Sequence, residues 1–215
     1  MLKQRLTATG DIVPERFAPQ RLLYRGDAGG FPVPVDLIRF PGVTSAEGTI
    51  AWPPGRDIVM NVAGFEEALS TSVPLEIEDG LAVRVASIPR LALLKRIAWA
   101  DPGTATNKDA ADLYPLLAAY ADAGHVDRLV DEEMGLVESI AFDVPSAGRE
   151  LLGRDVARLC PASSSGMARP VLEPEASFEH LVNQIIDTSA TSGVLPAPEL
   201  VLDLFRRGLL SGAPG

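Results

Sequence analysis

Cysteine and lysine are scarce in this chain of 215 residues. A single cysteine, Cys160, excludes an internal disulfide, and neither cysteine nor histidine lies near it at the spacing of a zinc site, so we expect a buried or half-buried thiol. Only three lysines occur, at Lys3, Lys95 and Lys108. The net charge of −10 argues against a broad nucleic-acid-binding surface, which needs clustered Lys and Arg, but it is compatible with a small basic pocket for a nucleotide.

Several other features are missing. No apolar run approaches the about 18 residues of a membrane span, and the first residues lack the apolar core of a signal peptide, so we expect a cytoplasmic protein without a membrane partner. The sequence contains no glycine-rich phosphate loop, no dinucleotide fingerprint and no Gly-x-Ser-x-Gly elbow. Hydrophobic residues make up 47% and charged residues 22%, which is ordinary for a globular protein with one sizeable core or two small domains.

The order of patterns along the chain predicts an α+β protein. Residues 1–87 are rich in strand signals and punctuated by Pro and Gly, whereas residues 88–160 have the periodicity of helices. Residues 161–174 have the composition of a linker, and residues 175–215 are expected to form C-terminal helices. We therefore predict an N-terminal sheet region, a helical region that packs on it, a linker and a helical end.

Local signals place individual elements within this outline. Asp79-Gly80 predicts a hairpin turn between strands over residues 75–78 and 82–85. After Pro89 the apolar residues Leu91, Leu94, Ile97 and Ala98 share one helical face, and Asn107 is expected to cap the next helix. Further predicted elements are a short helix over 2–8, paired strands over 12–17 and 21–25, and helices over 126–138, 147–159, 175–188 and 197–209.

Asp36 is the first candidate site residue. It lies between Val35 and Leu37 in a run that predicts an extended strand. Carboxylates on adjacent strands hold the divalent metal that phosphoryl and nucleotidyl transfer require, because their side chains converge on one face of a sheet. The alternative is a lone acid at the rim of a strand.

Lys95 and the start of the next helix supply the second candidate group. A lysine within the apolar stretch 91–99 either extends to solvent or faces a phosphate in a cleft. Asp109 and Asp112 are three residues apart, so they share a helical face and could hold Lys95 by charge pairing; Lys108 precedes them. The alternative is an exposed helix start with capping acids. His125 and His180 are expected to be structural or on the surface, and residues 131–133 are expected to be a solvated acidic helix face.

The amino-acid sequence of residues 22–117 resembles that of a known protein family. The matching phrases are Arg21-Leu22-Leu23-Tyr24-Arg25, Pro34-Val35-Asp36-Leu37-Ile38, Ile50-Ala51-Trp52-Pro53-Pro54, Val59-Met60-Asn61-Val62-Ala63-Gly64-Phe65-Glu66-Glu67-Ala68-Leu69, Val83-Arg84-Val85-Ala86-Ser87-Ile88-Pro89, Leu93-Leu94-Lys95 and Lys108-Asp109-Ala110-Ala111-Asp112-Leu113. In this order they resemble the predicted nucleotidyltransferases related to AbiEii toxins of bacterial abortive-infection systems, within the polymerase-beta-like superfamily.

The resemblance implies a nucleotidyltransferase-like mixed sheet with a helical C-terminal region. It also implies Mg²⁺ as cofactor, a catalytic and metal-binding role for Asp36, and a catalytic, phosphate-facing role for Lys95. Lys108, Asp109 and Asp112 would line or support the nucleotide pocket. The family's Gly-Ser turn and Asp-x-Asp pair belong before a helix whose end resembles residues 2–8, and this sequence does not contain them. We therefore expect an N-terminally truncated version of the sheet.

Three functions are consistent with these observations. The first is transfer of a nucleotide from a nucleoside triphosphate to an acceptor, with RNA as the candidate acceptor; it predicts an in-frame upstream extension carrying the missing motif, and without that motif little transfer is expected. The second is a non-catalytic toxin–antitoxin or defence subunit that binds a cognate antitoxin or another protein. The third is a nucleotide-binding sensor that uses Lys95 and Lys108 without chemistry.

Overall fold

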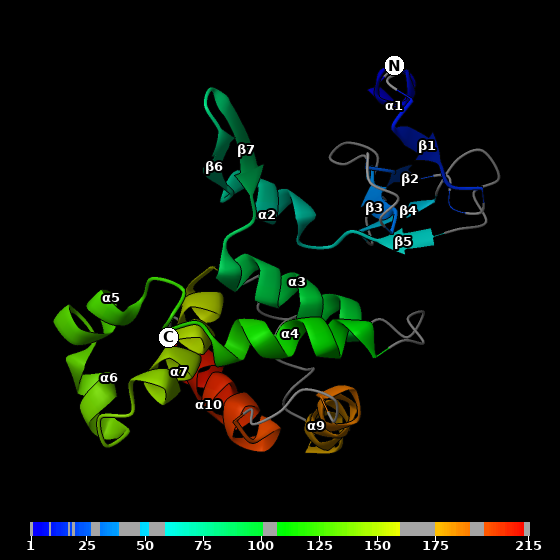
Figure 1. Cartoon of the computed structure of the whole chain (residues 1–215). Coiled ribbons are helices and arrows are strands. Elements are labelled where there is room, and N and C mark those ends of the chain that lie inside the picture. The colour runs from blue at the N-terminus through cyan, green and yellow to red at the C-terminus, as the bar shows by residue number, and fades with distance from the viewer. Residues whose placement is uncertain are drawn as a thin grey trace. The chain divides into compact units, whose positions relative to one another are not determined.

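The computed structural model describes residues 2–8, 10–16, 18, 20–26, 31–38, 48–51, 59–100, 107–159, 175–189 and 196–212. The chain divides into two compact units, Met1–Glu66 and Glu67–Gly215. Cys160, the expected linker over 161–174 and residues Trp52-Pro53-Pro54 of the resemblance lie outside the described residues. Within the described residues the protein is an α+β protein, as predicted, and its small sheets are antiparallel (Figure 1).

The first unit contains two small sheets. Helix α1 (Leu2–Thr7) precedes a three-stranded sheet in the order β1 (Ile12–Pro14), β2 (Arg21–Tyr24) and β3 (Val33–Asp36), which confirms the pairing predicted for the first two strands. Strands β4 (Thr49–Ala51) and β5 (Val59–Asn61) form a second, two-stranded sheet. Leu22 and Ile50 are the buried aliphatic side chains of these strands, with exposures of 0% and 5%.

The second unit begins with a hairpin. Helix α2 (Phe65–Ser70) spans the division between the units and is followed by β6 (Val73–Glu78) and β7 (Leu81–Val85). The turn is Asp79-Gly80, as predicted, and Gly80 has φ +78°, a conformation that glycine adopts without strain.

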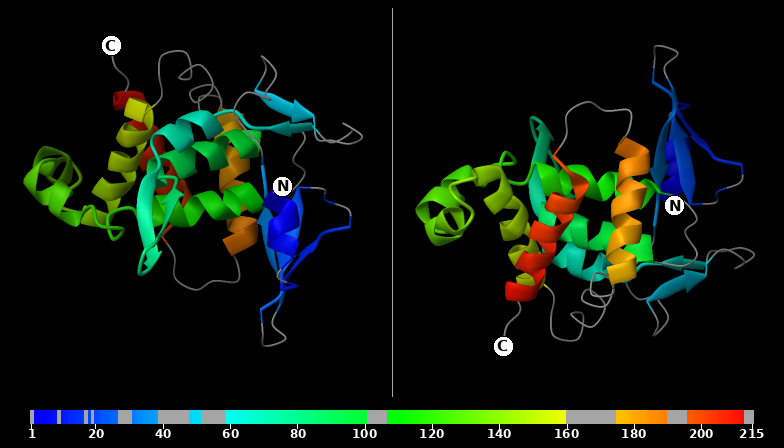
Figure 2. Two further views of the ribbon diagram at one scale, coloured as in Figure 1. Left: turned by 90° about the horizontal axis from the view of Figure 1, so that it is seen from above. Right: turned by 90° about the horizontal axis from the view of Figure 1, so that it is seen from below.

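Helices complete the second unit. They are α3 (Ile88–Ala100), α4 (Lys108–Ala118), α5 (Val126–Asp131), α6 (Met134–Ser139), α7 (Val144–Leu159), α9 (Glu175–Ser189) and α10 (Pro198–Ser211). Their common core includes Leu113 and Leu117 of α4, Leu151 of α7, Ile185 of α9 and Phe205 of α10, all 0% exposed. The two views of Figure 2 show α7 and α10 side by side, and α9 next to α4.

Not every prediction about these helices is confirmed. The helix expected over 126–138 is interrupted between α5 and α6, where the amide of Glu133 returns to the carbonyl of Arg128 at 3.1 Å. The apolar residues expected to share one face of α3 are half-buried, because packing against α4 and α7 turns the neighbouring face inward. The buried residues of α3 are Pro89, Arg90, Ala92, Leu93 and Arg96. Asn107 stands at the expected N-cap of α4, but its side chain makes no capping bond.

Candidate functional site

Lys95, Asp109 and Asp112 come together on the facing sides of α3 and α4. The Lys95 ammonium donates to Asp109 Oδ1 at 3.1 Å and to Asp112 Oδ2 at 2.6 Å. The three side chains are 25%, 15% and 39% exposed, so the cluster is half-buried but reachable from solvent. Both aspartates therefore pair with Lys95, which is the first of the two alternatives that the sequence left open. Lys108, the first residue of α4, is exposed.

The two aspartates stabilise the charged form of Lys95. Burial by itself would lower the pKa of Lys95, but the bonds from Asp112 and Asp109 outweigh burial and raise the pKa above its ordinary value. The cluster thus carries one positive and two negative charges. Such a site repels a free phosphate group and favours a phosphate that arrives with a divalent cation.

The carboxylate oxygens that do not accept a hydrogen bond from Lys95 are suitable ligands for a divalent cation. Oδ2 of Asp109 and Oδ1 of Asp112 receive no hydrogen bond from any residue that the structure describes. Mg²⁺ is commonly held by one or two carboxylates together with water and substrate phosphates, so these two oxygens match its preferred donors. Within the described ranges, no group of three or more His, Cys, Asp or Glu residues forms a larger metal site.

Asp36 belongs to the first unit and is an ion-pair partner there. It is the last residue of β3, directly opposite Arg21 of β2 in the antiparallel register. The Arg21 guanidinium donates from Nε to Oδ1 and from Nη2 to Oδ2 of Asp36, both at 2.8 Å, in a bidentate pair. The metal role that the resemblance implies for Asp36 stays a prediction, and it would require this pair to open or to share the carboxylate.

A second polar cluster was missed by the sequence reasoning. Asp155 of α7 is 8% exposed and accepts two bonds from Arg128, at 2.7 and 2.8 Å, and one from the Tyr120 hydroxyl at 2.8 Å. Burial alone would raise the pKa of Asp155, but the bonds from Arg128 and Tyr120 outweigh it and lower the pKa. The His125 ring stacks on Tyr120 with centroids 4.0 Å apart, and burial, with the charge of Arg128, lowers the pKa of His125. We call these four residues the Asp155 network.

The Asp155 network extends to the break between α5 and α6. Glu133 lies 3.6 to 3.7 Å from the guanidinium groups of Arg128, Arg154 and Arg158, so the expectation that it belongs to a solvated helix face is wrong. Asp131 and Glu132 are exposed, as expected. The spacing of Arg154 and Arg158 on one face of α7 was visible in the sequence, but their partner Glu133 is brought to them only by the break before α6.

A third contact joins α3 to α9. Trp99 Nε1–H donates to Gln184 Oε1 at 2.6 Å, and the Gln184 amide nitrogen lies 3.1 Å from His180 Nε2. Because indole nitrogen can only donate, Gln184 must present its oxygen to Trp99 and its NH₂ to His180, which sets His180 Nε2 as an acceptor. His180 is thus tied to a helix contact on the surface, in line with the structural or surface role expected for it.

Comparisons with known proteins identify no family for this chain. No family model, no curated protein and no solved structure matches the chain. Among the described residues, no helix is long and apolar enough to cross a membrane.

Proposed function

We propose that the second unit binds a nucleoside triphosphate through Lys95, Asp109 and Asp112, and that the chain is a nucleotidyltransferase-family protein of the AbiEii-related kind. The observation that carries this proposal is the double ion pair between Lys95 and the two aspartates. These residues belong to the last two sequence segments that resemble the family. They meet in space although they are 14 and 17 positions apart in the sequence.

The chemistry of the cluster fits the phosphates of a metal-bound nucleotide. Mg²⁺, when bound with the nucleotide, would neutralise phosphate charge, and Asp109 and Asp112 would hold it through the oxygens that Lys95 leaves available. Lys95 would then donate to a phosphate oxygen while remaining aligned by the two aspartates. The resemblance adds Asp36 as a metal-binding acid, a nucleotidyltransferase-like mixed sheet, and transfer to an acceptor such as RNA; these parts of the proposal rest on the resemblance alone.

Calorimetric titration with nucleoside triphosphates, with and without Mg²⁺, tests the binding site. We expect Mg²⁺-dependent binding that Lys95→Met weakens by about tenfold or more, since a charge-assisted contact to phosphate is worth about 1.5–3 kcal/mol. Lys3→Met removes the same charge from the first unit and serves as the matched control, with unchanged affinity. Lys95→Arg should retain part of the binding. Binding that is absent in the unmodified chain, or equal in Lys95→Met, would contradict the proposal.

A second candidate is supported by the hairpin of the second unit. Val73, Leu75 and Ile77 of β6 and Leu81 and Val83 of β7 are 38% to 57% exposed, and the register places Leu75 opposite Val83. Alternation along both strands gathers these side chains on one face, an arrangement that marks protein contact sites. This favours a non-catalytic subunit that binds a cognate antitoxin or another protein. Incorporation of labelled nucleotide into RNA by the purified chain, abolished in Asp36→Asn, would decide for transfer and against this candidate.

A further inference from the structure

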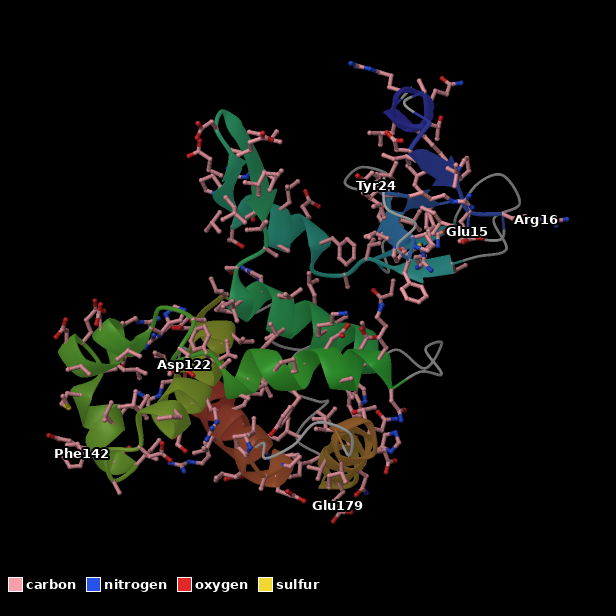
Figure 3. All side chains as sticks on the ribbon, viewed as in Figure 1. Glu15, Arg16, Tyr24, Asp122, Phe142 and Glu179 are labelled. Atoms are coloured by element: carbon pink, nitrogen blue, oxygen red, sulfur yellow. The ribbon has the colours of Figure 1, made fainter. Side chains whose placement is uncertain are left out.

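Residues 126–143, which form α5, α6 and the turn into α7, contain an exposed phenylalanine next to their last residue. We call this segment the acidic arm. Phe142 is 67% exposed, and Figure 3 shows its side chain on the outer side of the turn. Both Ala141 and Phe142 have positive φ, at 52° and 64°. The acidic arm therefore presents a large apolar side chain to solvent from a backbone conformation that glycine or asparagine would adopt more readily.

Two ordinary structural roles would bury Phe142, and neither does so. The turn is a Schellman motif, in which Phe142 N–H donates to Val137 O at 2.9 Å and Ala141 N–H to Glu138 O at 3.1 Å. Such a motif usually places the residue at the position of Phe142 against the one at Val137. Phe142 also precedes Asp143, whose carboxylate caps α7 by accepting from the Ser146 amide and hydroxyl. An apolar residue directly before the N-cap usually packs on the fourth residue of the helix, which is Ala147 in α7.

The exposures show that the helix termini do not use the Phe142 ring. Val137 and Ala147 are 2% and 0% exposed, while two thirds of Phe142 remains in water. A bulky residue held at positive φ is an outlier that other constraints must impose, and such outliers cluster at functional sites. Most of the Phe142 ring is therefore available for contact with another molecule.

The charge around Phe142 restricts what could cover it. The acidic arm contains six acidic residues and a single basic residue, Arg128. Glu133 is paired with Arg128, Arg154 and Arg158, which leaves five exposed acids: Asp127, Asp131, Glu132, Glu138 and Asp143. Arg128 is bound to Asp155 of α7, so it does not offset the exposed acids. Glu138 lies one helical turn before Phe142 and is exposed, and Asp143 follows directly. This surface repels nucleic acid and a second copy of the chain, which itself carries a net charge of −10.

We propose that Phe142 is the anchor of a protein-binding surface, and that its partner is a basic peptide segment whose apolar side chains cover the ring and whose Lys and Arg residues face the surrounding acids. Buried aromatic anchors dominate the energy of small interfaces, and complementary charge around them speeds encounter and selects the partner. The site is independent of Lys95 and of nucleotide binding.

A random peptide display library, selected on the whole chain, provides the probe. The selected peptides are expected to combine Lys or Arg with apolar residues, to bind more weakly as salt rises, and to lose about tenfold or more in affinity to Phe142→Ser. Phe142→Leu should keep part of the affinity. Phe31, which is 99% exposed in the first unit, supplies the matched control, and Phe31→Ser should bind as the unmodified chain does.

Several results would overturn the proposal. These are selection of no peptide, selection of peptides without basic residues, or equal loss of affinity in Phe31→Ser and Phe142→Ser. A thermal melt supplies an independent check, because replacing a mostly exposed ring should leave the unfolding midpoint of Phe142→Ser within about 2 °C of the unmodified chain. A decrease of roughly 5 °C or more would show that the ring supports the fold, and would refute the anchor role.

Discussion

Replacing Gly208 by alanine should separate two helices that touch through their backbones. Gly208 of α10 lies against α7, and a Cβ at this position would meet the Glu150 carbonyl oxygen and lie 2.9 Å from the Arg154 amide nitrogen. Gly153 makes the reciprocal contact, since its Cβ would lie 2.8 Å from the Leu209 nitrogen and 2.9 Å from Gly208 Cα. All these neighbours are backbone atoms, so no side chain can rotate to make room.

Two opposing effects set the size of the change. Overpacking a close contact costs about 1–3 kcal/mol, and the upper end applies because rigid helix backbones must move apart. The higher helix propensity of alanine offsets about 1 kcal/mol of this cost. We therefore expect Gly208→Ala to lower the free energy of unfolding by about 2 kcal/mol, which for a unit of this size lowers the melting temperature by roughly 4–8 °C.

Urea denaturation followed by far-ultraviolet circular dichroism measures this change, because the second unit contains nearly all of the helix that the structure describes. Gly135→Ala in α6 is the matched control, since no atom lies within 4 Å of the Cβ it would gain and its φ is not positive. That variant should be neutral or more stable by up to about 1 kcal/mol. If Gly208→Ala proves as stable as Gly135→Ala, the close crossing of α7 and α10 is wrong.

Three further predictions concern buried polar groups. Asp155→Asn removes the charged partner of Arg128 and should lower the free energy of unfolding by about 3 kcal/mol in denaturant titrations. His125→Phe should keep the ring stacked on Tyr120 and reduce the loss of stability between neutral pH and about pH 5, measured by melting at each pH. Arg149 is 5% exposed and donates to Ser146 Oγ at 3.0 Å, but its buried Nε has no acceptor in the described residues. Arg149→Met should therefore be neutral or raise the free energy of unfolding by about 1 kcal/mol.

The signs of the two pH effects follow from the folded-state pKa values. Asp155 has a lowered pKa, so its contribution is present above the ordinary value of 3.8 and is lost as the pH falls through the lower folded value; Asp155→Asn should lack this acid dependence. His125 also has a lowered pKa, so its contribution is present above 6.5 and is lost on acidification. An unchanged pH dependence in His125→Phe would refute the assignment. For Arg149→Met, a loss of several kcal/mol would mean that the guanidinium is well satisfied.

The sequence predicted those features that depend on neighbours along the chain. Asp79-Gly80 was sufficient for the hairpin, because few other residue pairs suit its turn. The limits of α7, α9 and α10 followed from helical periodicity within one to three residues, including Pro198 in the first turn of α10. Asp109 and Asp112 were placed on one face by their spacing, and the structure confirms that this face holds Lys95.

Features that depend on distant segments were missed or left open. The buried face of α3 was left open, because periodicity identifies an apolar stripe, whereas packing against α4 and α7 decides which residues are covered. Asp36 was recognised as a strand acid, but its bidentate partner Arg21 is set by the register between β2 and β3. The Asp155 network was not foreseen, since Arg128 and Asp155 come from different helices and each is ordinary in its local sequence.

The sequence by itself therefore determined the α+β composition, the limits of several helices and of the hairpin strands, and the two charged groups worth testing, Asp36 and the Lys95 cluster. Tertiary structure alone decided which charges are neutralised, which apolar faces are covered, and that Phe142 remains in water. The physical reason is the separation along the chain over which each interaction acts. Turn chemistry and helical spacing act within a few residues, whereas burial and ion pairing depend on which segments pack together, and that packing is a property of the whole folded chain.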